Sequence, residues 1–191
     1  PGSLNAGAAV CTAYGGGAPV MGRTGNIMSH LIGQGRGQLH DLPDQLATLR
    51  GLTKWADRID HPTQAAAKMS TAFTEMNSGR QRPVAVEVPW DVFGQKGVAP
   101  EQTAAPVQHT TLDPDAIEAA AEMIAAAKNP MIMVGGGALD AAAEVLALAE
   151  KIQAPVASHR SGKGIVADDN PHAMNLIAAY DYYRNCDLLI G

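Results

Sequence analysis

Three glycines after a short apolar strand have the types and spacing that most directly suggest a ligand site. Gly135, Gly136 and Gly137 follow the predicted strand 131–134 and precede a helical pattern. Backbone N–H groups at such a turn, together with the helix dipole, favour a bound phosphate. The full dinucleotide fingerprint is not met, because Asp140 stands at its sixth position. A tight turn that binds nothing explains the glycines equally well, so both interpretations stay open.

Other polar residues give weaker signals. The turn from Ser161 to Gly164 also follows a predicted strand, but it lacks the earlier Gly and the following Ser or Thr of a P-loop. The six histidines include no pair at the i, i+4 spacing that binds a metal on one helix face, so no metal ligand is predicted. Trp55 and Trp90 are interpreted as core anchors rather than as ligand platforms.

Short β-branched runs between helical patterns indicate the elements that position these residues, and such runs are typical of a parallel sheet. The first half predicts helices over 4–14 and 61–78, strands over 18–21, 52–56 and 83–88, and a mostly irregular segment over 22–45 with a short helix near 27–31. An irregular segment of that length inside a compact unit is usually functional or disordered.

The second half repeats the alternation after a Gly-, Pro- and Thr-rich stretch that reads as a linker. It predicts a helix from Pro114 with Asp113 as its N-cap, helices over 138–152 and 172–183, and strands over 131–134, 155–158 and 187–190. The predicted fold class is α/β, with two units that each have a parallel, doubly wound sheet. The predicted domains are 1–97 and 114–191, joined by a linker over 98–113.

Composition narrows the class of protein. The chain has 191 residues, a formal net charge of −5 and two cysteines. An acidic chain is a poor match for a nucleic-acid surface, which needs clustered Lys and Arg. Cys11 and Cys186 have no metal spacing, which favours a reducing compartment. No apolar stretch approaches the length that spans a bilayer. Cytoplasm is therefore the expected location.

Both ends look cut. The chain starts at Pro1 without an initiator Met and stops at Gly191 directly after a predicted strand. A strand is a poor place for a natural terminus, since its following loop would be missing. The expectation is an internal piece of a longer protein.

The order of several segments is more specific than any one of them, and the chain resembles the acetolactate synthase and benzaldehyde lyase family of thiamine diphosphate-dependent enzymes. The matching segments are Pro1-Gly2-Ser3-Leu4-Asn5, Thr12-Ala13-Tyr14, Ala18-Pro19-Val20, Asp44-Gln45, Leu52-Thr53-Lys54-Trp55-Ala56, Arg82–Val92, Met133–Ala138, Ala154–Ser158, Gly162-Lys163-Gly164 and Cys186–Gly191. They extend over essentially the whole chain.

The resemblance implies that residues 1–97 are the C-terminal part of the pyrimidine-binding domain and that 114–191 are a truncated central domain. It places Pro1, Gly2 and Asn5 near the aminopyrimidine ring. A glutamine from the long loop is expected on the substrate side, with Gln45 as first choice and Gln38 as second. The synthases carry Phe before that glutamine, whereas Gly37 stands here, so their acceptor specificity is not implied.

In the central domain, Gly135, Gly136, Gly137, Ser161 and Gly162 occupy the places that a dinucleotide would touch. The stretch 175–180 lacks the G-x-H-G-type pattern of flavin-containing synthases, which disfavours a required FAD.

The function implied is that of a lyase, decarboxylase or carboligase acting on 2-oxo acids, aldehydes or 2-hydroxy ketones, in a homodimer or homotetramer. Thiamine diphosphate and Mg²⁺ are the implied cofactors. The activating Glu would lie before Pro1 and the magnesium-binding G-D-G…N segment after Gly191, so the piece alone is expected to be inactive. The alternatives are a non-enzymatic FAD- or nucleotide-binding module and a degenerate paralogue.

Overall fold

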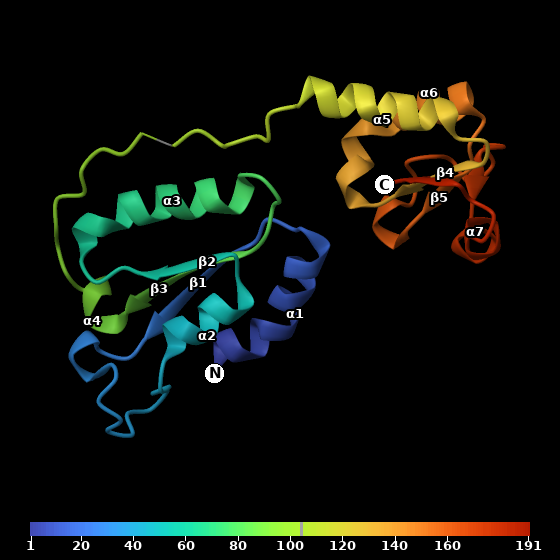
Figure 1. Ribbon diagram of the computed structural model, residues 1–191. Coiled ribbons are helices and arrows are strands. Elements are labelled where there is room, and N and C mark those ends of the chain that lie inside the picture. Colours follow the sequence, from blue (N-terminus) through green and yellow to red (C-terminus); the bar gives the residue numbers. More distant parts are fainter. Residues whose placement is uncertain (104) are drawn as a thin grey trace. The chain divides into compact units, whose positions relative to one another are not determined.

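The chain divides into two compact units, Pro1–Thr110 and Thr111–Gly191, in a computed structural model that describes residues 1–103 and 105–191. Both units are α/β with parallel strands, as the sequence predicts. Figure 1 shows the helices and strands of each unit. The boundary at Thr110 lies inside the predicted linker. Residues before the boundary contact the first unit, because Gln108 accepts a hydrogen bond from the N–H of Gly79 and donates one to Ser78.

The first sheet has the strand order β1-β3-β2. Its elements are α1 (Gly2–Gly16), β1 (Met21–Asn26), α2 (Gln45–Leu52), β2 (Trp55–Arg58), α3 (Ala65–Asn77), β3 (Val84–Pro89) and the short α4 (Trp90–Phe93). Short 3-10 helices cover Ser29–Leu31 and Pro62–Gln64. Helix α1 ends at Gly17, whose φ of 69° is the left-handed conformation that glycine adopts without strain.

Helices cover both faces of this sheet (Figure 1). Along β3, Val84 and Val86 pack with Ala72 and Met76 of α3. Ala85 points to the opposite face, where it packs with Leu49 of α2. Side chains alternate across a strand, so Glu87 lies on the same face as Ala85 and therefore on the α2 side.

The second sheet has the strand order β6-β5-β4-β7. Its elements are α5 (Pro114–Ala126), β4 (Pro130–Val134), α6 (Ala142–Ile152), β5 (Val156–Ser158), β6 (Ala173–Met174), α7 (Leu176–Tyr183) and β7 (Leu188–Ile190). Ile132 and Val134 pack toward α6, whereas Met131 packs with Ala179 of α7 on the other face. Helix α5 begins as predicted, with the Asp113 carboxylate accepting from the N–H groups of Asp115 and Ala116.

Several predicted elements are wrong in part. The expected strand 18–21 is β1, which starts only at Met21 and continues to Asn26 within the segment predicted as irregular. The expected helix 61–78 begins with the 3-10 helix Pro62–Gln64, and α3 follows from Ala65 to Asn77. The expected strand 52–56 is the end of α2 followed by β2, because Asp44 caps a helix over Gln45–Leu52, where no helix was predicted. The expected helix 138–152 begins with a 3-10 helix over Gly136–Ala141, and α6 starts only at Ala142. The expected helix 172–183 starts late, because Ala173 and Met174 pair with β5 before Asn175 caps α7.

Within the described residues, none of the helices combines the length and the apolar character that crossing a bilayer requires.

Candidate functional site

A cavity of about 740 Å³ lies where β1 and β3 end. Parallel sheets bind ligands at the carboxyl ends of their strands, because the loops there diverge and leave a crevice. The walls come from the start of α1, the end of β1, the segment before α2, and α4. The lining residues are Pro1, Gly2, Ser3, Thr24, Gly25, Asn26, Ile27, Met28, Gln38, Leu39, His40, Gln45, Trp90 and Phe93.

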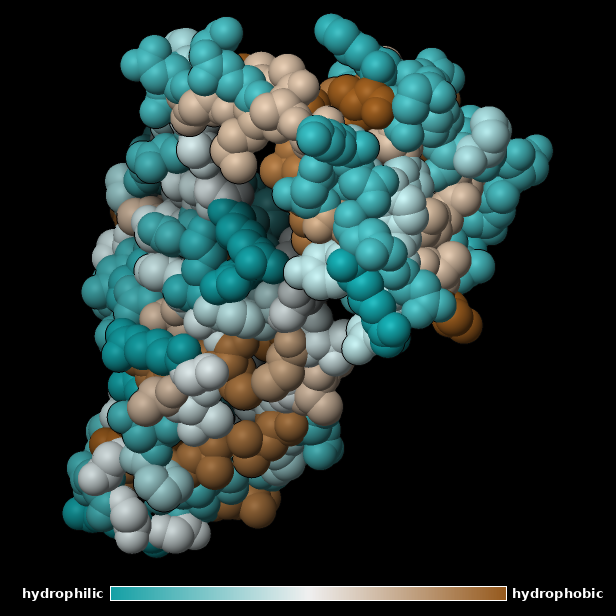
Figure 2. All heavy atoms as spheres, turned by 45° about the vertical axis from the view of Figure 1, so that its right-hand side comes forward, coloured by the Kyte–Doolittle hydropathy of each residue, from teal (hydrophilic) through white to brown (hydrophobic). Residues whose placement is uncertain are grey.

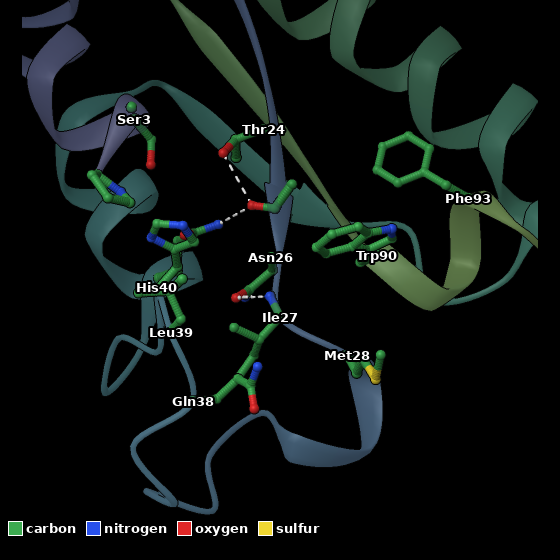
Figure 3. Close-up of a pocket in the computed structure, with 14 residues that line it drawn as sticks. Ser3, Thr24, Asn26, Ile27, Met28, Gln38, Leu39, His40, Trp90 and Phe93 are labelled. Carbon is green, nitrogen blue, oxygen red and sulfur yellow. Dashed lines mark hydrogen bonds between the residues drawn. The ribbon is translucent and has the colours of Figure 1, made fainter.

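Apolar and aromatic side chains dominate the mouth of this cavity. Figure 3 shows Trp90 and Phe93 on one side of the strand end, with Leu39 and His40 on the other. Leu39 and Trp90 leave about three quarters of their surface exposed, at 75% and 74%, and Phe93 leaves 68%. Figure 2 shows hydrophobic residues reaching the surface among polar ones on one face of the molecule. Apolar walls with few polar groups are typical of small-molecule sites.

Trp90 corrects the expectation of a core anchor. It opens α4 directly after Pro89, and this turn carries its ring away from the core to the cavity wall. Trp55 does pack against the core on the α3 face. The sequence alone could not show which tryptophan is buried in the core and which lines the cavity. In the structure, Trp90 lies at a strand-to-helix turn and Trp55 begins a strand.

The two predicted glutamines line the same cavity but differ in their surroundings. Gln45 is the first residue of α2 and is 7% exposed. Its Nε2 donates to the carbonyl oxygen of Gly25 at 2.8 Å and to the Glu87 carboxylate at 2.9 Å. Gln38 is exposed in the irregular segment before α2 (Figure 3).

Helix capping places Gln45. The Asp44 carboxylate accepts from the N–H of Ala47 at 2.9 Å, which starts α2 at Gln45. The first residue of the helix thereby faces the end of β1. The sequence signal for this helix was the Asp44 cap, which also fits a simple turn.

Glu87 is a polar residue of the site that the sequence analysis did not select. It is fully buried in β3, where its carboxylate also pairs with the Arg58 guanidinium from β2. The two residues are direct neighbours in the parallel register. The available signal was a charged residue at a core-facing position within an apolar strand, which is rare unless the charge is paired.

His40 is a second residue that was not selected. Its φ of 73° is left-handed, an uncommon conformation for a residue other than glycine, and its side chain lines the cavity. Such backbone positions gather at functional sites.

Ser29 and Asp91 lie at the rim of the cavity, because they directly follow the lining residues Met28 and Trp90 along the chain. The N–H and the hydroxyl of Ser29 donate to the two carboxylate oxygens of Asp91 at 2.8 and 2.6 Å. These hydrogen bonds lower the pKa of Asp91 below its ordinary value, and the bond from the Ser29 hydroxyl has the larger effect. They join the segment after β1 to α4.

Of the three N-terminal residues predicted near the aminopyrimidine ring, two line the cavity and one does not. Pro1 and Gly2 line the cavity, and nothing lies within 4 Å of the position that a Cβ on Gly2 would take. Asn5 is exposed on α1 and is absent from the cavity lining. The structure therefore brings Pro1, Gly2, Gln38 and Gln45 together and leaves Asn5 outside.

In the second unit, the turn 135–137 contacts Ser161. The N–H of Gly136 donates to the Ser161 Oγ at 3.1 Å. Gly162 lies so close to β4 that a Cβ would come within 2.4 Å of the Val134 carbonyl oxygen. A Cβ on Gly135 or Gly136 would lie within 4 Å of Ser161, whereas nothing lies within 4 Å of the position that a Cβ on Gly137 would take. The predicted residues of this unit thus form one strand-end cluster.

Comparison with known proteins identifies the class. The sequence model for the thiamine pyrophosphate enzyme central domain matches residues 117–191. A probable 2-ketoarginine decarboxylase of Pseudomonas aeruginosa is 33% identical over 174 residues, which are 90% of this chain and 31% of that protein. A probable acetolactate synthase large subunit of Methanocaldococcus jannaschii is 31% identical, covering 100% of this chain and 34% of its own length. The large subunit of acetolactate synthase isozyme 1 from Escherichia coli is 29% identical over 94% of this chain and 32% of its own length.

Residues 117–191 belong to the thiamine pyrophosphate enzyme central domain family, and the chain as a whole is similar in sequence to the relatives just named. These likenesses support the enzyme interpretation and not the nucleotide-binding module. The chain spans about a third of the length of the relatives it matches.

The first-unit cavity fits the ring part of such a cofactor. The open space at Gly2 lets a planar ring approach the backbone, and Trp90 and Phe93 offer aromatic surface. The carboxamides of Gln38 and Gln45 supply hydrogen-bonding groups for a heteroaromatic edge.

Proposed function

We propose that the chain supplies the aminopyrimidine side of a thiamine diphosphate site in a lyase, decarboxylase or carboligase. The substrates would be 2-oxo acids, aldehydes or 2-hydroxy ketones. The observation that carries the proposal is the cavity at the carboxyl ends of β1 and β3, which both predicted glutamines line together with Pro1 and Gly2. In this assignment residues 1–97 are part of the pyrimidine-binding domain, 98–113 are the linker and 114–191 are the central domain.

The roles of this chain's residues follow from their places in the cavity. Gly2 allows close approach of the backbone, and Trp90 excludes water from one side of a bound ring. Gln38 is exposed and free to turn toward a substrate, whereas Gln45 is held in place by its hydrogen bonds. Asn5 would have to act from outside this cavity, so its proposed contact has the weakest support.

The chemistry that thiamine diphosphate supplies when bound is an electron sink for breaking or forming a bond to a carbonyl carbon. The protein's part is to orient the reacting groups and to exclude water. Mg²⁺ is proposed as the second cofactor, held by residues outside this chain. A homodimer or homotetramer in the cytoplasm is proposed for the whole protein.

For the second unit we propose no required FAD. The support is that Ser161 already accepts from the N–H of Gly136, so that donor is used within the protein. The α-helix also starts at Ala142, which moves its N-terminal dipole away from the glycines. Calorimetric titration with FAD, ADP and CoA tests this proposal. No saturable heat is expected, and saturable binding that Gly136→Ala abolishes would instead favour a dinucleotide site.

The enzyme proposal is tested on the protein made from the complete coding sequence. Reading that sequence first should find a Glu before residue 1 and a G-D-G…N segment after residue 191. With thiamine diphosphate and Mg²⁺, we expect turnover of at least one of pyruvate, benzoylformate, oxalyl-CoA and benzoin. Absence of both motifs, with no turnover of any of the four, would refute the assignment.

Two variants test whether the cavity is the site. Gln38→Leu removes an exposed carboxamide from the cavity and should lower kcat/KM by about 10-fold to 100-fold, as the loss of a hydrogen bond to a reacting group does. Gln81→Leu is the matched control, because Gln81 is an exposed glutamine that does not line the cavity. Equal kcat/KM values for the two variants would move the site elsewhere.

A further inference from the structure

We propose that Glu87 is a positioning residue of the first-unit cavity, which fixes the Gln45 carboxamide so that its Oε1 faces the ligand. The cavity would then recognise a hydrogen-bond donor, an amino or hydroxyl hydrogen, at this point. The inference rests on the proposed function for the identity of the ligand, but not for the orientation of the amide.

The orientation follows from the two groups that the Gln45 nitrogen meets. One is the carbonyl oxygen of Gly25 at 2.8 Å, and the other is the Glu87 carboxylate at 2.9 Å. Both are acceptors, so only the NH₂ end of the amide can face them. Both Nε2 hydrogens are thereby used within the protein.

The carbonyl end of Gln45 is left for the cavity. No described residue donates to Gln45 Oε1, and this atom is not among the fully buried polar atoms without a partner. It is therefore reachable from the cavity that Gln45 lines. An accessible carbonyl oxygen on a fixed amide is a directed acceptor.

Glu87 can fix the Gln45 amide because its own carboxylate is buried and paired with a cation. The residue has no exposed surface, and its second carboxylate oxygen pairs with the Arg58 guanidinium. Arg58 has only donors, so it keeps a carboxylate oxygen on its side. A buried, paired carboxylate between two strands and a helix moves little, and it sets the geometry of the group that it binds.

A neutral replacement makes a specific prediction. In Glu87→Gln, the side-chain carbonyl oxygen of the new glutamine would accept the hydrogen bond from Arg58. Its NH₂ group would then face the NH₂ group of Gln45. Two donors repel, so the Gln45 amide would lose its hydrogen bond to residue 87 and keep only the one to the Gly25 carbonyl oxygen, which frees one Nε2 hydrogen and loosens the amide. The shape of the side chain is preserved, which separates this effect from loss of packing.

The test is the exchange of side-chain amide protons with water, measured by ¹⁵N NMR on the 191-residue chain. In the wild type, the Gln45 amide protons should exchange about tenfold or more slowly than those of Gln38, since hydrogen-bonded donors are protected. In Glu87→Gln, Gln45 exchange should rise toward the Gln38 rate. Glu75→Gln is the control, because Glu75 lies on α3 outside this cavity; it should leave Gln45 exchange unchanged.

Two outcomes would overturn the proposal. One is equal exchange of Gln45 and Gln38 in the wild type, which is decisive even if the variant fails to fold. The other is a folded Glu87→Gln variant whose Gln45 protons stay protected.

Addition of thiamine at millimolar concentration distinguishes the two proposals. A donor from the pyrimidine ring should shift the Gln45 ¹³Cδ resonance while its amide protons stay protected. Protected protons with no shift anywhere in the cavity would retain the positioning role and count against the thiamine site.

Discussion

The strand-end sites of the two units differ in how their polar groups are used. In the first unit, the strands end in a cavity that two carboxamides and an aromatic wall line. In the second unit, the N–H of Gly136 donates to Ser161, and Gly162 packs too closely against Val134 to leave room for a side chain. The same parallel architecture thus supports an open site in one unit and a close-packed turn in the other. At the glycine turn of the second unit, the Gly136 N–H is therefore already used within the protein.

The units also differ in what stabilises the region below the site. The first unit places a paired charge, Glu87 with Arg58, beneath the cavity. The second has an apolar cluster around Val134 and Val156. We therefore expect the first site to depend on electrostatics and the second on close packing.

The largest expected effect is that of Arg58→Met. It would leave the Glu87 carboxylate buried without its cation, and breaking such a pair typically costs about 3 kcal/mol or more of unfolding free energy. Urea unfolding followed by tryptophan fluorescence reports on this unit, which contains both Trp55 and Trp90. Arg50→Met is the control, because Arg50 makes a longer, exposed contact with Asp57 at 3.9 Å and should cost under about 1 kcal/mol. Similar losses in both variants would contradict the electrostatic half of the comparison.

Gly162→Ala should have the next largest effect, in the second unit. The added Cβ would lie 2.4 Å from the Val134 carbonyl oxygen, and relieving that overlap requires a backbone shift that costs about 1–3 kcal/mol. Hydrogen exchange of the β4 and β5 amides should speed up accordingly. Gly137→Ala is the control within the same cluster, since nothing lies within 4 Å of its Cβ position. If Gly162→Ala exchanged at the wild-type rate, the close packing described here would be wrong.

Ser161→Ala sharpens the comparison further. It removes the acceptor of the Gly136 N–H and should cost about 1 kcal/mol, the usual net value of one hydrogen bond. It also frees that N–H, so the variant is the form of the second unit with the best chance of binding a phosphate. Calorimetry with ADP should show weak binding in this variant and none in the wild type. Tighter binding of ADP by the wild type would reverse the interpretation of the turn.

Much of the fold could be predicted from the sequence, because the buried strands are short apolar runs and the helices have clear starts such as Asp113-Pro114. The two glutamines were selected through family resemblance, and both line the cavity. Other features depend on tertiary structure. The burial of Glu87 needs Arg58 from another strand, and the exposure of Trp90 depends on the turn after Pro89. The short strand of Ala173 and Met174 is defined by its pairing with β5, which is distant in the sequence.

The smallest expected effect concerns the rim of the first cavity and its dependence on pH. Hydrogen bonds from Ser29 lower the pKa of Asp91 in the folded state, so this contact stabilises the fold above the unfolded pKa of about 4 and is lost as the pH falls through the lower, folded value. Ser29→Ala removes the hydroxyl donor, so the pKa of Asp91 should rise toward its ordinary value. The ¹³Cγ resonance of Asp91, followed between about pH 2 and 7, measures that change directly.

Ser3→Ala is the matched control for this titration, because Ser3 also lines the cavity but makes no contact with Asp91 among the described hydrogen bonds. It should leave the Asp91 titration where the wild type has it. The stability difference between Ser29→Ala and the wild type should be present at neutral pH and vanish in acid, where Asp91 is protonated in both. A difference that persists unchanged at the acid end would mean that Ser29 acts through packing, and the rim of the first site would then resemble the close-packed turn of the second.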